Sequence, residues 1–173
     1  VPEMIDAGID SFKIEGRMKT ALYVATVART YRKAIDDYMK DPKLYEANME
    51  WYKEEIGKCT YREFTTGFYF GKPGSDAQIY NSNTYVKNYT YLGTVEEADG
   101  KGRCRIEQKN KFSVGETIEI MKPDGRNLEV VVKSICDEDG NGQESAPHPK
   151  QILWVDLGAD VDKYDILRKK EDN

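Results

Sequence analysis

Apolar residues in the first third of the chain recur with helical spacing. One stripe follows Thr20, whose hydroxyl is suited to cap a helix, and it predicts a helix from Thr20 to about Lys40. The stripe consists of Val24, Val27, Ala28, Tyr31, Ile35 and Tyr38. Asp41 and Pro42 are typical of the start of a second helix, and Gly57 is typical of its end. The apolar face of this second helix is Tyr45, Met49, Tyr52 and Ile56.

Alternation with a period of two predicts β structure elsewhere. Ser11–Glu15 alternates between Gly8 and Gly16, which predicts a short strand before the first helix. After the second helix, strand-like runs alternate with Xaa-Gly pairs, a strong hairpin signal. These runs are Thr66–Gly71, Tyr89–Val95, Gly102–Glu107, Thr117–Met121, Leu128–Ile135, Gln151–Leu157 and Asp165–Arg168. We therefore predict an α+β fold, in which a short strand and two helices precede a small antiparallel β-barrel of about six strands.

The change from helical to strand-like patterning divides the chain into two regions. We place residues 1–71 in the first region and residues 72–173 in the second, with the boundary somewhere within residues 58–85. Pro73, Gly74, Ser75 and Asp76 have the composition of a linker or loop. Because the chain begins Val1-Pro2-Glu3 without an initiator methionine, we expect it to be part of a larger protein.

Charge is distributed unevenly along the 173 residues. The net charge is −5 and the sequence pI is near 5.1, so the chain as a whole is not expected to bind polyanions. Residues 11–40 hold seven basic and three acidic side chains; this stretch carries +4, which leaves −9 for the remainder. Such a basic stretch fits contact with RNA or another anion, but it also fits a solvated helix face.

Cysteine and histidine are too sparse for the usual metal sites. The three cysteines, Cys59, Cys104 and Cys136, form no CxxC pair, and His148 is the one histidine, so we expect no metal site in this chain. An odd number of cysteines, far apart in the sequence, is more typical of a protein in a reducing compartment than of a disulfide-bonded one. No apolar run approaches the length needed to span a membrane. We therefore expect a cytoplasmic protein without a membrane anchor.

Two sequence blocks carry a family resemblance. Asp6–Lys19 reads DAGIDSFKIEGRMK, and Arg62–Gly71 reads REFTTGFYFG. Both blocks, in this order and joined by two helices, resemble peptidase family U32, the collagenase-like proteases. The resemblance implies a larger protein with a TIM-like domain as the partner of this chain, and residues 6–19 would form its last strand and loop. Lys111–Ile120 and Tyr164–Arg168 resemble the second-domain barrel of translation factors at the level of the fold.

The resemblance also supplies candidate site residues. Glu15 and Arg17 are catalytic candidates, because active sites of TIM barrels lie at the C-terminal ends of the strands; a structural salt bridge is the alternative. Lys13, Arg62 and Phe64 are candidates for substrate binding, and Arg62 with Phe64 fits an aromatic–basic patch that stacks on a base. We expect Phe68 and Phe70 to lie in a core instead.

The residues leave three functions open. The first is the C-terminal region of a U32 peptidase, not catalytic alone, whose barrel binds or orients an RNA or polypeptide substrate. The second is an accessory domain of a tRNA or rRNA hydroxylase of the same family, in which the resemblance implies an iron–sulfur cluster held outside this chain. The third is a structural domain for capping or oligomerisation. A nucleophilic Cys59 is disfavoured because no histidine lies near it in the sequence.

Overall fold

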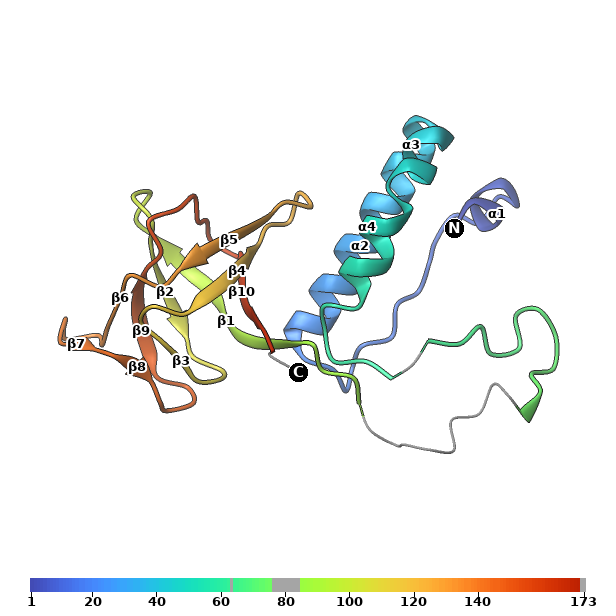
Figure 1. Ribbon diagram of the computed structural model, residues 1–173. Helices are drawn as coiled ribbons and strands as arrows, with labels where there is room; N and C mark the ends of the chain where they lie inside the picture. The colour runs from blue at the N-terminus through green and yellow to red at the C-terminus, as the bar shows by residue number, and fades with distance from the viewer. Residues whose placement is uncertain (63, 76–84, 172–173) are drawn as a thin grey trace.

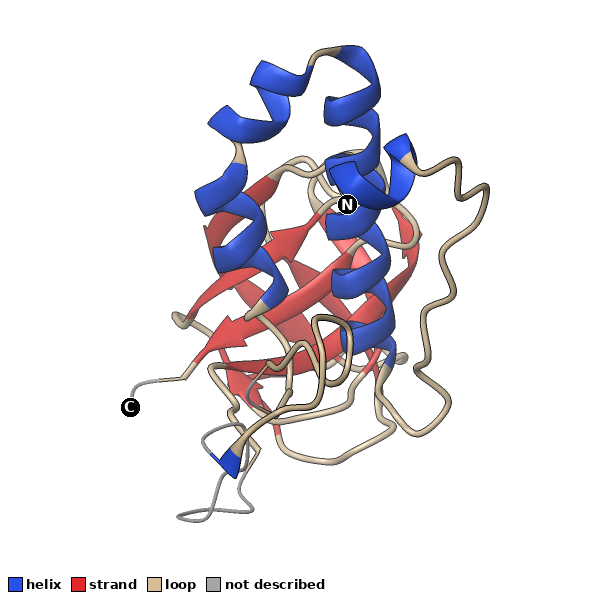
Figure 2. Cartoon of the chain, turned by 90° about the vertical axis from the view of Figure 1, so that its right-hand side faces the viewer, coloured by secondary structure: helices blue, strands red, loops and turns tan. Residues whose placement is uncertain are grey.

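The helical and β regions form two layers that pack side by side. The structure is a computed structural model that describes residues 1–62, 64–75 and 85–171. The helices are α1 (Pro2–Asp6), α2 (Ala21–Lys40), α3 (Pro42–Ala47) and α4 (Met49–Ile56). Figure 1 shows α2 and α4 running alongside each other next to the β region, and Figure 2 shows both helices in front of the sheet.

The predicted helices are confirmed, with one interruption. The Thr20 side chain accepts a hydrogen bond from the backbone N–H of Tyr23 (3.3 Å), and α2 ends at Lys40 as its stripe predicts. The second helix starts after Asp41 and ends at Gly57, but Asn48 divides it into α3 and α4.

Ten strands form the β region, all paired antiparallel within the described residues. They are β1 (Tyr89–Ala98), β2 (Arg103–Glu107), β3 (Phe112–Ser113), β4 (Thr117–Met121), β5 (Asn127–Val131), β6 (Ser134–Cys136), β7 (Gly142–Gln143), β8 (Ser145–Ala146), β9 (Ile152–Asp156) and β10 (Ile166–Lys170). Eight of them make one curled sheet in the order β5-β4-β10-β1-β2-β9-β6-β7, a half-barrel, and β3 pairs with β8. The α+β class with a small barrel-like domain is thus confirmed.

Curvature of the half-barrel comes from irregularities in the long strands. The register of β1 shifts at two points, between Tyr91 and Gly93 against β10 and between Val95 and Glu97 against β2. Such bulges increase the local twist and let one strand serve two parts of a curled sheet. The predicted run Leu128–Ile135 is likewise divided, because β5 pairs with β4 whereas β6 pairs with β9.

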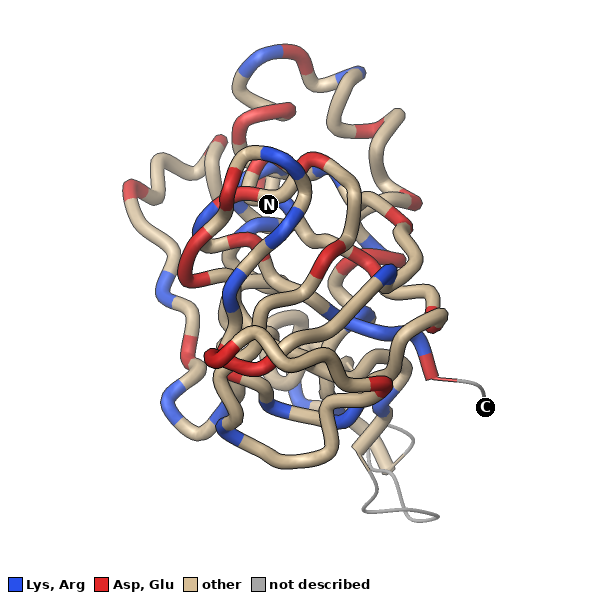
Figure 3. Tube along the Cα trace, turned by 90° about the vertical axis from the view of Figure 1, so that its left-hand side faces the viewer, with Lys and Arg blue, Asp and Glu red and all other residues tan. Residues whose placement is uncertain are grey.

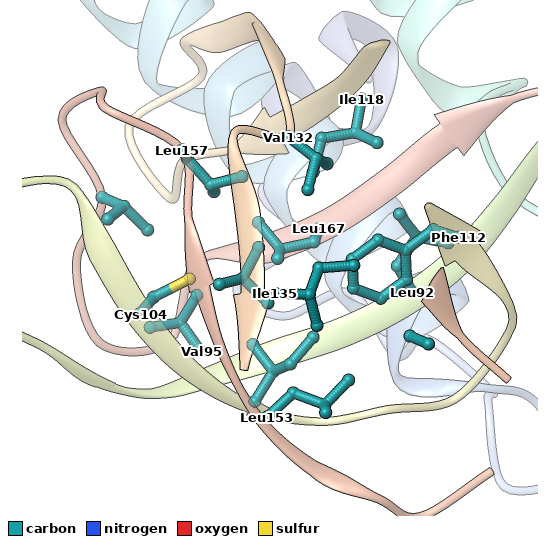
Figure 4. Packing of buried hydrophobic residues seen from close by; sticks show 14 of the residues in the cluster. Leu92, Val95, Cys104, Phe112, Ile118, Val132, Ile135, Leu153, Leu157 and Leu167 are labelled. Carbon is teal, nitrogen blue, oxygen red and sulfur yellow. The ribbon is translucent and has the colours of Figure 1, made fainter. Parts of the chain in front are cut away.

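One continuous apolar core fills the half-barrel. Residues from nearly every long strand point into it, and Figure 4 shows Leu92, Val95, Phe112, Ile135 and Leu167 packed together there. Buried positions alternate with less buried ones along β2 and β9, as the period of two predicts, and the outward positions of β2 are all charged. The core consists of Leu92, Val95, Cys104, Ile106, Phe112, Ile118, Ile120, Val132, Ile135, Ala146, Leu153, Val155, Leu157, Val161 and Leu167.

Two predicted strands are wrong. Ser11–Glu15 is an irregular segment between α1 and α2, and Thr66–Gly71 forms turns. In the second segment, backbone hydrogen bonds run locally, from Tyr69 N–H to Thr66 O (3.1 Å) and from Gly71 N–H to Phe68 O (3.2 Å). A strand needs a neighbour to pair with, and neither segment lies along an edge strand of the described sheets. Of the predicted linker, Asp76 and the residues up to 84 lie outside the described residues.

Candidate functional site

Aromatic and cationic side chains gather where the helical region meets the start of the β region. Tyr61 and Val86 form an isolated antiparallel bridge with backbone N···O distances of 3.1 and 2.8 Å. This bridge brings the segment after α4 next to the residues that precede β1. The rings of Tyr61 and Phe64 stack with a centroid distance of 4.5 Å and an interplanar angle of 2°. Nearby, the guanidinium of Arg62 lies 4.8 Å from the ring centroid of Tyr85.

A second cation reaches the same group from the start of α2. The Lys19 ammonium lies 4.7 Å from the ring centroid of Tyr85 and 5.2 Å from that of Tyr23. We refer to Tyr61, Phe64 and Tyr85, with Lys19 and Arg62, as the aromatic platform. Phe64 is 61% exposed, so a planar ligand has access to the face of its ring that is not stacked on Tyr61. Exposed aromatic faces beside cations suit the stacking of nucleic-acid bases and the attraction of phosphates.

The structure separates the predicted site residues into two groups. Arg62 and Phe64 lie in the aromatic platform. Lys13 and Glu15 line a different cavity of about 370 Å³ between the segment before α2 and α2 itself. Glu15 and Arg17 lie in an irregular segment rather than at the end of a strand, and the carboxylate of Glu15 accepts a hydrogen bond from the backbone N–H of Arg17 (2.8 Å).

Sequence reasoning missed Lys19, Tyr61 and Tyr85. Tyr61 carried a weak signal, since it precedes Arg62 in an aromatic–basic–aromatic run. Tyr85 carried none, because the bridge between Tyr61 and Val86 joins residues 25 positions apart.

The expectation that Phe68 and Phe70 lie in a core is wrong. They are 77% and 82% exposed, and the ring of Phe70 contacts that of Tyr69 edge-on at 5.0 Å. Because the segment forms turns rather than a strand, neither ring has a sheet to pack on.

A buried ionic cluster fixes α2 and α4, whose flanking segments hold most of the platform, to the half-barrel. Arg29 of α2 donates to the carbonyl oxygen of Lys122 (2.7 Å) in the turn after β4 and to the carboxylate of Glu55 in α4. Arg168 of β10, fully buried, lies 2.7 Å from the same carboxylate and donates from Nε to Glu119 of β4 (2.6 Å). We call Arg29, Glu55, Lys58, Glu119 and Arg168 the ionic cluster.

Lys58 extends this cluster toward the platform. Its ammonium lies 3.5 Å from Glu119 and 3.6 Å from Glu55. Burial alone would lower the pKa of Lys58, but these two carboxylates raise it above its ordinary value, so the side chain is a cation at neutral pH. Burial would likewise raise the pKa of Glu55, but Arg168 and Arg29 hold it below its ordinary value.

Cys59, the residue after Lys58, belongs to a small apolar cluster between the helical and β layers. It is buried with Leu22, Met121 and Ile166. Burial raises the pKa of its thiol to about 11, which leaves almost no thiolate at neutral pH. Cys59 is therefore a packing residue rather than a nucleophile.

The residues present do not fit an iron–sulfur cluster or another resident metal. Across residues 1–62, 64–75 and 85–171, no group of three or more His, Cys, Asp and Glu side chains could hold a metal ion. We accordingly assign no chemical step to such a group in this chain. In the same parts of the chain, none of the helices is both long enough and apolar enough to cross a bilayer.

Comparison with known proteins identifies the family. Residues 1–79 match the model of peptidase family U32, and residues 87–168 match the model of the peptidase family U32 C-terminal domain. The chain belongs to peptidase family U32. Lys19, Tyr61, Arg62 and Phe64 of the aromatic platform lie within the first U32 match, and Tyr85 and Val86 lie between the two matches.

The curated U32 relatives carry two kinds of name. "tRNA hydroxylation protein P1" of Bacillus subtilis (strain 168) is 38% identical over 170 residues, which are 98% of this chain and 40% of that protein. "Collagenase" of Porphyromonas gingivalis (strain ATCC BAA-308 / W83) is 39% identical over 116 residues, which are 61% of this chain and 28% of that protein. This chain therefore spans about two fifths or less of the length of these relatives.

A solved structure from the family also matches. It is the C-terminal domain of a U32 family protein from Geobacillus thermoleovorans, and it is 31% identical to this chain. The match covers 47% of this chain and 92% of the Geobacillus domain, with a TM-score of 0.43.

Proposed function

We propose that this chain is the RNA-contacting region of a U32 tRNA hydroxylation protein. In this proposal it binds and orients RNA in the cytoplasm and does not catalyse hydroxylation by itself. The chemistry, and the iron–sulfur cluster that the family resemblance implies, would be supplied by the TIM-like domain of the larger protein. The observation that carries the proposal is the aromatic platform.

The net negative charge of the chain favours a small, localised contact with RNA over a broad phosphate-binding surface. Non-specific affinity for nucleic acid comes mainly from many Lys and Arg contacts to phosphates, and a chain of net charge −5 offers no such surface. Over the face of the half-barrel turned away from the helices, acidic and basic positions are interspersed (Figure 3). Stacking of a base on Phe64, assisted by the nearby cations Lys19 and Arg62, provides affinity that does not depend on a large basic patch.

The similarity to the B. subtilis protein supports tRNA as the substrate class, since it extends over 98% of this chain. The name "Collagenase" of the second relative supports a polypeptide instead, over 61% of this chain. The buried thiol of Cys59, with a pKa raised to about 11, supplies no nucleophile for peptide hydrolysis. The platform therefore favours the RNA alternative.

The test is binding of fluorescein-labelled tRNA transcript and single-stranded RNA, followed by fluorescence anisotropy at low salt. Phe64→Ala is expected to raise Kd about 5- to 150-fold, because stacking of one base on an aromatic side chain is worth about 1–3 kcal/mol. The control is Tyr164→Ala, which removes an exposed ring beside Lys163 on the half-barrel and is expected to leave Kd unchanged. Absence of RNA binding, or equal Kd values for wild type and Phe64→Ala, would contradict the proposal. A gain of binding to a collagen-like peptide in place of RNA would favour the polypeptide alternative.

A further inference from the structure

A groove of about 690 Å³ opens beside the aromatic platform. It lies between the end of α4, the start of β1 and the end of β10, and its volume is within the range of about 300–1,000 Å³ common for ligand sites. Lys53 and Lys58 line one side, Lys170 lines the other, and Tyr89 lies between them. The groove is therefore built from parts of the chain that the ionic cluster already holds together.

The base of the groove holds a cation in a fixed position. Lys58 is only 12% exposed and is held by Glu54, Glu55 and Glu119, and its ammonium lies 5.6 Å from the ring centroid of Tyr89. The guanidinium of Arg168 lies 5.1 Å from the same ring. Lys58 is ordered by its partners before any ligand arrives, so an anion that binds here does not have to immobilise it.

Charge distinguishes this groove from the cavity next to it. Three lysines and two glutamates, Glu54 and Glu171, line the groove. The neighbouring cavity of about 470 Å³ shares Tyr89, Lys170 and Glu171 and is also lined by Lys169 and by Glu116, Glu119 and Glu129, so four glutamates face two lysines there. A polyanion is therefore attracted to the groove and repelled from the neighbouring cavity. This difference in charge determines on which side of Tyr89 a polyanion lies.

Tyr61 joins the groove to the aromatic platform. Tyr61 is one of the residues that line the groove, and its ring stacks on that of Phe64. A ligand with alternating planar and anionic groups can thus place a planar group on the exposed ring of Phe64 and an anionic group near Lys53 and Lys170. Single-stranded RNA has this chemistry, because its unstacked bases are free to stack on aromatic side chains while its phosphates remain exposed.

We propose that the groove lined by Lys53, Lys58 and Lys170 holds the phosphate backbone of single-stranded RNA next to the nucleotide whose base stacks on the aromatic platform. This inference rests on the proposed function and extends it from a stacking site to a site of more than one nucleotide. Because the neighbouring cavity is acidic, we expect the bound RNA backbone not to extend past Tyr89 into that cavity.

The test is the salt dependence of binding of a fluorescein-labelled single-stranded RNA. Each phosphate contact with single-stranded nucleic acid contributes roughly 0.7 to the slope of log K against log salt. Lys53→Gln/Lys170→Gln is expected to reduce the slope by about 1.4. Both lysines are peripheral to the ionic cluster, and the ion pair of Lys53 with Glu50 is exposed at both side chains, so the variant is expected to fold.

The matched control is Lys43→Gln/Lys101→Gln, which changes the net charge equally but lies outside both cavities. The inference is overturned if the two double variants give equal slopes, or if the groove variant keeps the wild-type slope. If Phe64→Ala weakens binding while the groove variant does not change the slope, the groove fails and the proposed function stands. If wild type does not bind RNA, the proposed function itself fails. If the groove variant lowers the slope but Phe64→Ala is neutral, stacking on the aromatic platform is disproved, and the proposed function and this inference both fail.

Discussion

Glu55 is the residue on which the junction between helices and half-barrel depends. Its carboxylate is almost fully buried and lies between the guanidinium groups of Arg29 and Arg168. Removing one member of a buried charge group leaves its partners without compensation, which typically destabilises a protein by about 3–5 kcal/mol. We expect Glu55→Gln, which keeps the shape and loses the charge, to lower the free energy of unfolding by that amount in urea denaturation.

The control for this prediction is Glu50→Gln on the same helix. Glu50 pairs with Lys53 at 3.0 Å, but its side chain is exposed, so the change is expected to stay within about 0.5 kcal/mol. Equal effects of the two substitutions would show that the ionic cluster does not stabilise the junction.

At the scale of single elements, β1 leaves little room for a side chain at position 93. A Cβ atom there would lie 3.0 Å from the carbonyl oxygen of Glu107 and 3.3 Å from Ile106 Cδ1, closer than side chains normally pack. We expect Gly93→Ala to destabilise the half-barrel by about 1–3 kcal/mol, because the strands β1 and β2 must separate to accommodate the methyl group. Gly142→Ala in β7, where a Cβ would meet no atom within 4 Å, is the matched control in thermal unfolding. A loss as large for Gly142→Ala would contradict this explanation.

Elements with strong local patterns could be predicted from the sequence. The stripe of α2 and its Thr20 cap are local, and β4 is found at its predicted bounds, Thr117–Met121. Ser11–Glu15 and Thr66–Gly71 alternate like strands but have no pairing partner, which no local pattern reveals. The platform was half predictable for the same reason: Arg62 and Phe64 are close in sequence, whereas Lys19 and Tyr85 reach the site only through tertiary contacts.

At the scale of the whole molecule, the buried carboxylates predict lower stability in acid. Burial would raise the pKa of Glu55 and of Asp37, but Arg168 and Arg29 lower that of Glu55, and hydrogen bonds from Lys33, Tyr52 and Asn48 lower that of Asp37. A pKa lower in the folded than in the unfolded chain contributes stability above the unfolded pKa, near 4, and this contribution is lost as pH falls through the folded pKa. We expect the free energy of unfolding to fall from about pH 5 downward, and to fall less steeply in Glu55→Gln. An equal slope in both proteins would exclude Glu55 as a source of the pH dependence.

The ionic cluster further predicts that the two layers unfold together. The two tryptophans report on one layer each, since Trp51 lies in α4 and Trp154 in β9. Trp154→Phe leaves a fluorescence probe for the helices, and Trp51→Phe leaves one for the half-barrel. Because Arg29, Glu55 and Arg168 join α2, α4 and β10 through buried contacts, we expect both probes to give the same urea midpoint, as a cooperative transition requires.

Adding Glu55→Gln to each single-tryptophan protein provides the decisive comparison. With Glu55 neutralised, the helices keep the small apolar contact around Cys59 and Met121 and the hydrogen bond from Arg29 to the carbonyl oxygen of Lys122, whereas the half-barrel retains its own continuous core. The Trp51 midpoint is then expected to fall below the Trp154 midpoint, and far-UV circular dichroism should show a helical loss that precedes the loss of sheet. Separate midpoints in the presence of Glu55 would mean that the two layers unfold independently. The aromatic platform and the groove are built from both layers, so they would then lack the fixed geometry that RNA binding at this junction requires.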